Sequence, residues 1–351
     1  MKAFAPVLAI CALLGAQARV APGDSVYTRP GQIVAAADGA RLNFYCMGSG
    51  SPTVVFESGW GDWAPAWATV QPKIAAWTRA CSYDRAGAGF SGPGPMPRTS
   101  VRIAEELHSA LRNAGIAGPY ILVGHAFGGD PARTFADLYT ADVAGLVLEE
   151  ADAGDVEPKA LQDEDHRGQA QFLPDVRACG DSVVGGKPLP LVTRSGRPPR
   201  TCAQTTFFRG LPESEWSGEL NASLLHIAET KGAMYDAFYS EMEQVPSDEV
   251  WLQQHRRSLG SRPLRVLTTG NHAVGHLPAS NAMEPKHIEY EHQIALAQAR
   301  WLELSSNAKQ IFVQQSSEYI QFDQPDAVIS AIRDVYDQSK KSLGRGRTSL
   351  P

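Results

Sequence analysis

A glycine-flanked turn in the first half of the chain has the spacing of a catalytic turn but lacks the reactive side chain. Residues 120–129 read as an apolar strand that runs into G-x-A-x-G, with Ala126 at the central position. The related pattern G-x-S-x-G forms a sharp strand-to-helix turn that holds a nucleophilic serine at the top of a sheet. The methyl group of Ala126 cannot attack a carbonyl carbon. The sequence therefore predicts the turn without its usual nucleophile.

Short apolar runs alternate with amphipathic segments on both sides of this turn. Runs typical of buried strands occupy residues 42–46, 53–57, 81–83, 120–123, 145–148, 264–268 and 311–313. Helical periodicity appears at residues 99–111, 289–305 and 328–336. Between residues 155 and 260 the alternation stops, and only helical pieces near 213–230 and 232–243 are expected. This order predicts an α/β fold, with a mostly parallel sheet, helices on both faces and an inserted cap.

The same pattern divides the chain into five parts. We expect a signal peptide at residues 1–18, a first core segment at 19–154, a cap or lid insertion at 155–260, a second core segment at 261–339 and a flexible tail at 340–351. The tail carries Gly, Ser, Arg and Lys without periodicity, which is typical of a frayed terminus.

The N-terminus has the features of an export signal. A positive start is followed by an apolar run at residues 3–14 and by Ala16-Gln17-Ala18, which fits the small-x-small cleavage rule. The run is too short to span a bilayer as a mature anchor. We therefore expect cleavage after about Ala18 and a secreted or periplasmic protein, with an uncleaved apolar anchor as the alternative.

Export makes disulfides permissible, and four cysteines remain after the expected cleavage. Cys46 and Cys81 lie in or beside predicted strands, and Cys179 and Cys202 bracket a Gly/Pro-rich loop. The economical pairing is therefore Cys46 with Cys81 and Cys179 with Cys202. Buried free thiols are the alternative.

Four local motifs, in this order along the chain, resemble the α/β-hydrolase superfamily. They are residues 56–61 (FESGWG), 83–91 (YDRAGAGFS), 124–128 (GHAFG) and 316–325 (SSEYIQFDQP). The resemblance covers roughly residues 38–155 and 262–338. It implies a triad of serine, acid and histidine in that chain order.

Two of these three positions are substituted. Besides Ala126 at the nucleophile, Glu318 occupies the place where the superfamily usually has histidine. The resemblance assigns the acid to Glu150, at the end of a predicted strand, with Asp152 as the second choice. Acids at the end of this strand are also compatible with a solvated rim.

The resemblance also implies an oxyanion hole, which needs two backbone N–H groups rather than side chains. Trp60 and Phe127 match the two donor positions. Trp60 and Trp63 are candidates to line an apolar pocket, although packing between helix and sheet would also explain tryptophans here. His125 is the variable residue inside the turn, whose side chain generally packs away from a substrate, and it is a weaker candidate for a replacement base.

Other motifs give no support for a cofactor or a metal. The G-x-G-x-x-G pattern at residues 87–92 is followed by a proline-rich stretch instead of the helix that a dinucleotide site requires. His272 and His276 have i, i+4 spacing, but Gly275 favours a loop. We therefore expect no cofactor and no metal.

Composition limits the partners. The net charge of −6 gives no reason to expect nucleic acid or an anionic membrane surface. A small apolar or carbonyl-bearing ligand is the expected partner, and nothing in the sequence specifies the oligomeric state.

The resemblance and its departures favour a catalytically inactive member: a small-ligand binder or pseudoenzyme. Two alternatives remain open. One is an ester-type hydrolase in which Glu318 activates water, and the other is an active serine esterase that was deliberately inactivated. A single serine-to-alanine change would not account for Glu318.

Overall fold

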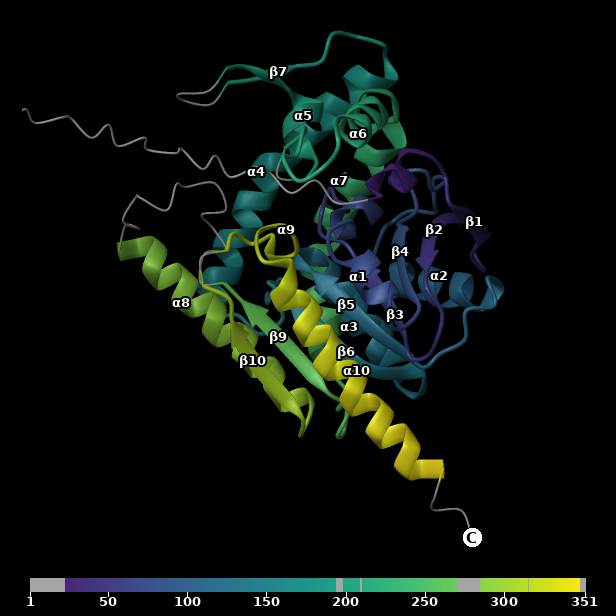
Figure 1. Cartoon of the computed structure of the whole chain (residues 1–351). Helices are drawn as coiled ribbons and strands as arrows, with labels where there is room; N and C mark the ends of the chain where they lie inside the picture. Colours follow the sequence, from purple (N-terminus) through teal and green to yellow (C-terminus); the bar gives the residue numbers. More distant parts are fainter. Residues whose placement is uncertain (1–22, 194–197, 209, 270–284, 315, 348–351) are drawn as a thin grey trace, which may run out of the picture.

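The computed structural model describes residues 23–193, 198–208, 210–269, 285–314 and 316–347 (Figure 1). The expected signal peptide at residues 1–18 lies outside these residues. An eight-stranded sheet forms the centre of the molecule, in the order β1-β2-β4-β3-β5-β6-β9-β10. Its strands are β1 Gln32–Ala35, β2 Arg41–Met47, β3 Thr53–Glu57, β4 Ala80–Asp84, β5 Tyr120–His125, β6 Val143–Glu149, β9 Leu264–Thr268 and β10 Ala308–Phe312.

The sheet is mostly parallel, as predicted. β1 and β2 pair antiparallel, as do β2 and β4, while every pair from β4 to β10 is parallel. All residues of β3, β4, β5, β6 and β9 are buried. This burial on both faces explains why most of these strands read as predominantly apolar runs in the sequence, although β4 and β9 also contain polar residues.

Alternate strand residues point to two separate hydrophobic layers. Val54 and Phe56 of β3 pack in the layer that α10 covers, whereas Val55 packs in the layer covered by α2 and α3. The helices around the sheet are α1 Gln71–Ala75, α2 Ser100–Asn113, α3 Gly129–Leu138, α8 Pro285–Ala299, α9 Ile320–Asp323 and α10 Pro325–Arg347. Short 3-10 helices are η1 Asp24–Thr28, η2 Ala64–Trp67, η3 Ala126–Gly128, η4 Thr140–Asp142 and η5 Arg300–Leu304. Helices on both faces confirm the predicted fold class.

The chain between β6 and β9 is largely helical. It contains α4 Lys159–Val184, a small hairpin of β7 Leu191–Val192 and β8 Arg200–Thr201, α5 Cys202–Thr206, α6 Gly218–Thr230 and α7 Gly232–His255. In Figure 1, α5 and α6 lie beyond one end of the sheet, and α4 and α7 lead back towards it. None of the described helices is long and apolar enough to cross a bilayer.

Both expected disulfides are present. Cys46 and Cys81 face each other across the antiparallel pair β2–β4, with their Cα atoms 4.1 Å apart. Cys179 of α4 is bonded to Cys202 at the start of α5, with a Cα separation of 5.9 Å. The structure therefore confirms the pairing that placement in the sequence favoured.

The C-terminal boundary differs from our expectation. α10 continues to Arg347, past residue 339 where we expected a flexible tail to begin. Lys340, Lys341 and Ser342 are exposed and still helical, because lysine is compatible with a helix without any apolar contact.

Candidate functional site

The turn after β5 has the backbone geometry of a nucleophile elbow. Ala126 adopts a left-handed conformation with φ of 47°, which is uncommon for a residue other than glycine. A Cβ atom on Gly124 would lie 2.6 Å from the carbonyl oxygen of Gly128. One on Gly128 would lie 2.5 Å from that of Glu57. Both flanking glycines are therefore required by close backbone approach, and the central side chain is not what sets the turn.

The segment that carries Glu318 lies beside this turn. The ring Nε2 of His125 is 3.1 Å from the backbone carbonyl oxygen of Glu318. This contact brings the predicted histidine position next to the elbow, although the two are far apart in the sequence. Glu318 itself is partly exposed, and Ala126 is also partly exposed.

Glu150 is a buried, hydrogen-bonded acid. Its side chain is 0% exposed, and its carboxylate accepts hydrogen bonds from the backbone N–H of Thr269 and from Nε2 of Gln298. Its backbone is also left-handed, with φ of 42°. This burial excludes a solvated rim for Glu150 and leaves it anchored to the end of β9.

Asp152 occupies a different environment from Glu150. Its backbone N–H donates to the carbonyl oxygen of Ala126 at 3.2 Å, and the residue lines a cavity. The two acid candidates thus differ in position: Glu150 is buried against neighbouring elements, and Asp152 lines the cavity beside the elbow.

His125 sits in a buried group of acids. The ring is 1% exposed, and Nδ1 is 3.7 Å from Oδ2 of Asp62. Burial alone lowers the pKa of His125, but the Asp62 and Glu149 carboxylates outweigh it and raise the pKa to about 9. This raised pKa favours the protonated ring at neutral pH, in which neither nitrogen has a lone pair to accept a proton.

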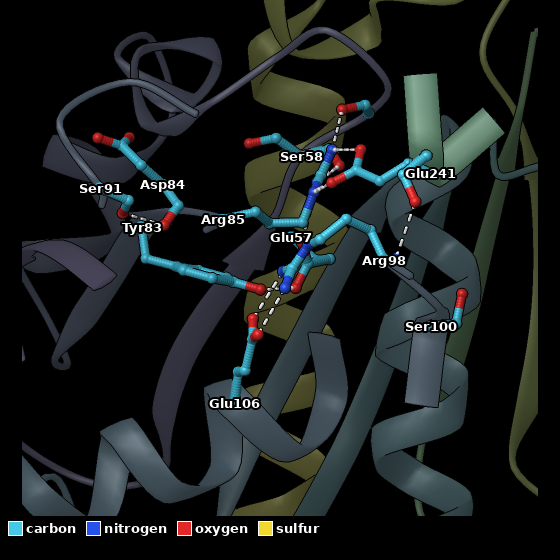
Figure 2. Close-up of polar contacts among 12 residues, drawn as sticks. Glu57, Ser58, Tyr83, Asp84, Arg85, Ser91, Arg98, Ser100, Glu106 and Glu241 are labelled. Atoms are coloured by element: carbon cyan, nitrogen blue, oxygen red, sulfur yellow. Dashed lines mark hydrogen bonds and ion pairs between the residues drawn. The ribbon is translucent and has the colours of Figure 1, made fainter. Parts of the chain in front are cut away.

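The guanidinium of Arg85, which Figure 2 shows beside Ser58 and Glu57, binds the loop that precedes the candidate oxyanion donor Trp60. Arg85 donates from Nη2 to the carbonyl oxygen of Gly59 at 2.8 Å, and from Nη1 to that of Ser58. This fixes the loop that carries Trp60, whose ring stacks on Phe127 at 5.1 Å between centroids. Among the described residues, the backbone N–H of Trp60 makes no backbone hydrogen bond outside the helices and strands. Phe127 lies in η3, directly after the central residue of the turn.

A cavity of about 600 Å³ opens beside the elbow, at the carboxyl ends of β5 and β6. Trp60 lines it, together with residues 151–154 after β6 and parts of α3, α4, α7 and α8. Trp63 and His125, the other pocket candidates, do not line this cavity. Trp63 is 1% exposed and packs against Phe207 and Phe208. The open space therefore lies on the Trp60 side of the turn.

Sequence reasoning did not identify Asp130, Glu249 and Tyr290 as cavity residues. Asp130 follows the elbow glycines directly, so its position in the motif was the one available signal. Glu249 and Tyr290 come from helices separated by β9, and no sequence pattern brings them together.

The described residues contain no group of three His, Cys, Asp or Glu side chains that could hold a metal ion. His272 and His276 lie outside the described residues. After the glycine-rich segment at residues 87–92, the next helix begins only at Ser100. No helix N-terminus is therefore placed to receive a pyrophosphate there.

Comparisons with known proteins agree with this architecture. The family described as "alpha/beta hydrolase fold" matches residues 52–178. The uncharacterized protein YqjL of Bacillus subtilis (strain 168) is 25% identical over 293 residues, which are 82% of this chain and 85% of that protein. The chain spans only 30%, 15% and 34% of three other curated relatives.

Solved structures match over most of the chain at low identity. Cfl2 from Burkholderia cenocepacia has a TM-score of 0.62 at 18% identity and covers 90% of this chain and 98% of its own. A thermophilic esterase from Thermogutta terrifontis has a TM-score of 0.56 at 21% identity, with 88% and 99% covered. At these identities the likeness concerns the fold.

Proposed function

Because this chain belongs to the α/β-hydrolase superfamily yet carries alanine at the elbow, we propose that it is a catalytically inactive member that binds a small ligand. The observation that supports this most strongly is Ala126, which keeps the left-handed elbow backbone with φ of 47° but has no nucleophilic atom. The cavity beside it offers the space for a ligand.

The rest of the site favours binding without covalent chemistry. In this proposal the backbone N–H groups of Trp60 and Phe127 receive a carbonyl oxygen of the ligand, since an oxyanion hole needs no side chain. His125 is buried and its raised pKa favours the protonated form, which disfavours it as a replacement for the missing base. Loss of the nucleophile and the base from such a site leaves only about 10³- to 10⁴-fold acceleration over water, from binding and the oxyanion hole.

One alternative rests on the partly exposed Glu318 beside the elbow. A carboxylate could activate water for direct attack on an ester, although its ordinary pKa of about 4.3 makes it a weak base. This alternative predicts turnover that depends on Glu318.

We also propose that the protein is exported after cleavage near Ala18 and that residues 155–260 act as a cap over the site. Two disulfides in the structure are compatible with an oxidising compartment. The helices α4 and α7 of that segment contribute residues to the cavity wall.

Ester hydrolysis by the purified mature protein tests the proposal. We expect short-chain aryl esters to be hydrolysed no faster than with a heat-treated control. A saturable rate that disappears in Glu318→Gln would contradict the proposal and support water attack.

Restoration of the triad tests the assignment of its positions. Ala126→Ser combined with Glu318→His should produce esterase activity and labelling by a fluorophosphonate, while either change alone produces little, because the triad acts as a unit. A folded double variant that reacts with no such probe would show that position 318 or Glu150 has been wrongly assigned.

A further inference from the structure

The charged residues that line the cavity beside the elbow are all acidic. Its described lining contains no Lys, Arg or His, but it contains six acids. They are Asp130, Asp152, Glu157, Glu164, Asp165 and Glu249. They come from α3, the segment after β6, α4 and α7, so the negative charge is a property of the assembled cavity rather than of one stretch of sequence.

One of these acids is buried and forms no side-chain hydrogen bond within the described part of the chain. Asp130 is 4% exposed, lines the cavity and accepts no hydrogen bond from the residues that the structure describes. The nearby guanidinium of Arg133 is instead bound to both carboxylate oxygens of Asp155, at 2.6 and 2.7 Å. A buried carboxylate that lacks a partner is costly. A ligand cation in the cavity would supply the missing one.

The ionisation of Asp130 agrees with this geometry. Burial raises the pKa of its carboxyl group well above the ordinary value, and Asp152, Asp155 and Asp248 raise it further, while Arg133 lowers it. A positive group beside Asp130 would favour the ionised form.

Other cavity acids are held in fixed positions. Oε2 of Glu249 accepts from Nε2 of Gln162 at 2.8 Å and lies 2.9 Å from Nε2 of His166. The hydroxyl group of Tyr290 donates to Oδ1 of Asp165 at 3.1 Å. The wall is therefore ordered before any ligand enters.

The remaining lining is apolar and aromatic. Trp60 and Tyr290 contribute rings, and Val245 and Ile294 contribute aliphatic side chains. Aromatic faces attract organic cations, and a volume of about 600 Å³ suits a small molecule rather than a bare ion. The acids are spread over the wall, and no three described His, Cys, Asp or Glu side chains converge to hold a metal ion.

We propose that this cavity binds an organic ammonium ion that carries an apolar group, with Asp130 as its buried counter-ion. The inference rests on the proposed function, since it names the ligand class for a site that binds without turnover. The ammonium group would lie near Asp130 and Asp152, and the apolar group would pack against Trp60 and Tyr290.

A pair of probes of the same shape tests the charge preference. Calorimetric titration of the full mature chain with 2-phenylethylamine and with 2-phenylethanol should show binding of the amine only. Binding of the amine should weaken as salt is raised, since the attraction is electrostatic. Equal binding of the alcohol, or no binding of the amine at millimolar concentration, would overturn the proposal.

One variant and a matched control test whether Asp130 is the counter-ion of the bound amine. Asp130→Asn keeps the shape and removes the charge, so it should weaken amine binding about 10- to 100-fold. Because Asp130 has no partner among the described residues, this variant should fold at least as stably as the parent. Asp175→Asn, on the exposed side of α4, is the matched control and should bind normally. Unchanged affinity in a folded Asp130→Asn protein would overturn the assignment.

The result of the amine-binding test can be distinguished from the result of the test for ester turnover. Amine binding together with ester turnover would leave the ligand class standing and refute the inactive site. Absence of both turnover and amine binding would refute the ligand class alone.

Discussion

Ala126 has the left-handed backbone conformation of a nucleophile elbow, but its side chain is a methyl group instead of a nucleophile. A left-handed residue other than glycine costs about 1–2 kcal/mol. Gly124 and Gly128 allow the close backbone approach of this turn, because a Cβ atom at either position would clash with a carbonyl oxygen. The elbow is therefore a property of the glycines and the sheet, and it persists when the nucleophile is replaced.

Glu149 offers a test of how burial controls ionisation at the site. Its side chain is 0% exposed, Oε1 accepts from the backbone N–H of Gln321 at 2.7 Å, and burial raises its pKa to about 7. The folded state therefore holds this proton more tightly than the unfolded chain, in which the pKa is about 4.5. The stability of the parent protein should fall as pH rises from about 4.5 to about 7, through this group alone.

We predict that Glu149→Gln gains stability relative to the parent over that pH range, by up to about 3 kcal/mol. The amide oxygen of glutamine can still accept from Gln321. Urea unfolding of both proteins at pH 4.5, 6 and 8 measures the difference, and the exposed Glu105→Gln is the control. A stability difference that does not change with pH would show that Glu149 is ionised in the folded protein throughout.

At the scale of elements, a buried ion network joins the sheet to α7. Arg85 follows β4 and pairs with Glu57 of β3 at 3.0 Å and with Glu241 of α7 at 2.9 Å (Figure 2). All three side chains are at most 4% exposed. The same guanidinium binds the loop before Trp60, so the position of α7 and that of the oxyanion loop are coupled.

We predict that Glu241→Gln destabilises the protein by about 2–3 kcal/mol, because it removes charge from a buried pair while Glu57 remains. Asp236→Asn is the matched control on the same helix. Asp236 pairs with Arg177 at the surface, where both side chains are about half exposed, and its loss should cost less than about 1 kcal/mol. Chemical denaturation of the three proteins distinguishes the two effects. Equal losses would mean that the buried network contributes no more than a surface pair.

The elements differ in how far the sequence reveals them. β3, β5, β6 and β9 are mostly apolar runs, interrupted in β9 by Arg265, so local pattern was sufficient to locate them. α4 was missed because most of its residues are exposed and Pro174 interrupts it, so no clear apolar stripe marks the helix. α7 extends past Pro246 to His255, and its second half is bound to α4 through Glu249, which contacts Gln162 and His166.

The residues of the candidate site also differ in whether the sequence alone predicts their positions. Ala126, Glu318 and Glu150 belong to local motifs, and their places could be predicted from sequence. The cavity could not, because Asp130, Glu249 and Tyr290 meet only after α3, α7 and α8 have packed around the ends of the strands.

At the scale of the whole molecule, polar contacts bind the segment between β6 and β9 to the rest of the chain. Nζ of Lys231 donates to the carbonyl oxygens of Gly89 and Ser91, at 2.6 and 2.5 Å. Oδ2 of Asp248 accepts from the backbone N–H and the hydroxyl group of Ser100, at 2.8 and 2.9 Å. With Arg85 and Glu241, these contacts reach both ends of α7. They favour unfolding of the described part of the chain as one unit.

The disulfide between Cys179 and Cys202 allows this to be tested, because it lies entirely within that segment and its cysteines are 23 residues apart. The chain-entropy model gives about 3 kcal/mol of stabilisation for a loop of this size. We predict that Cys179→Ser with Cys202→Ser lowers the midpoint of a single calorimetric transition, since weakening of α4 and α5 is transmitted through the contacts of α7. If a separate transition appeared at low temperature while the main transition stayed in place, the segment would be an independent unit. In that case its contacts with the sheet would be too weak to hold a cap over the site.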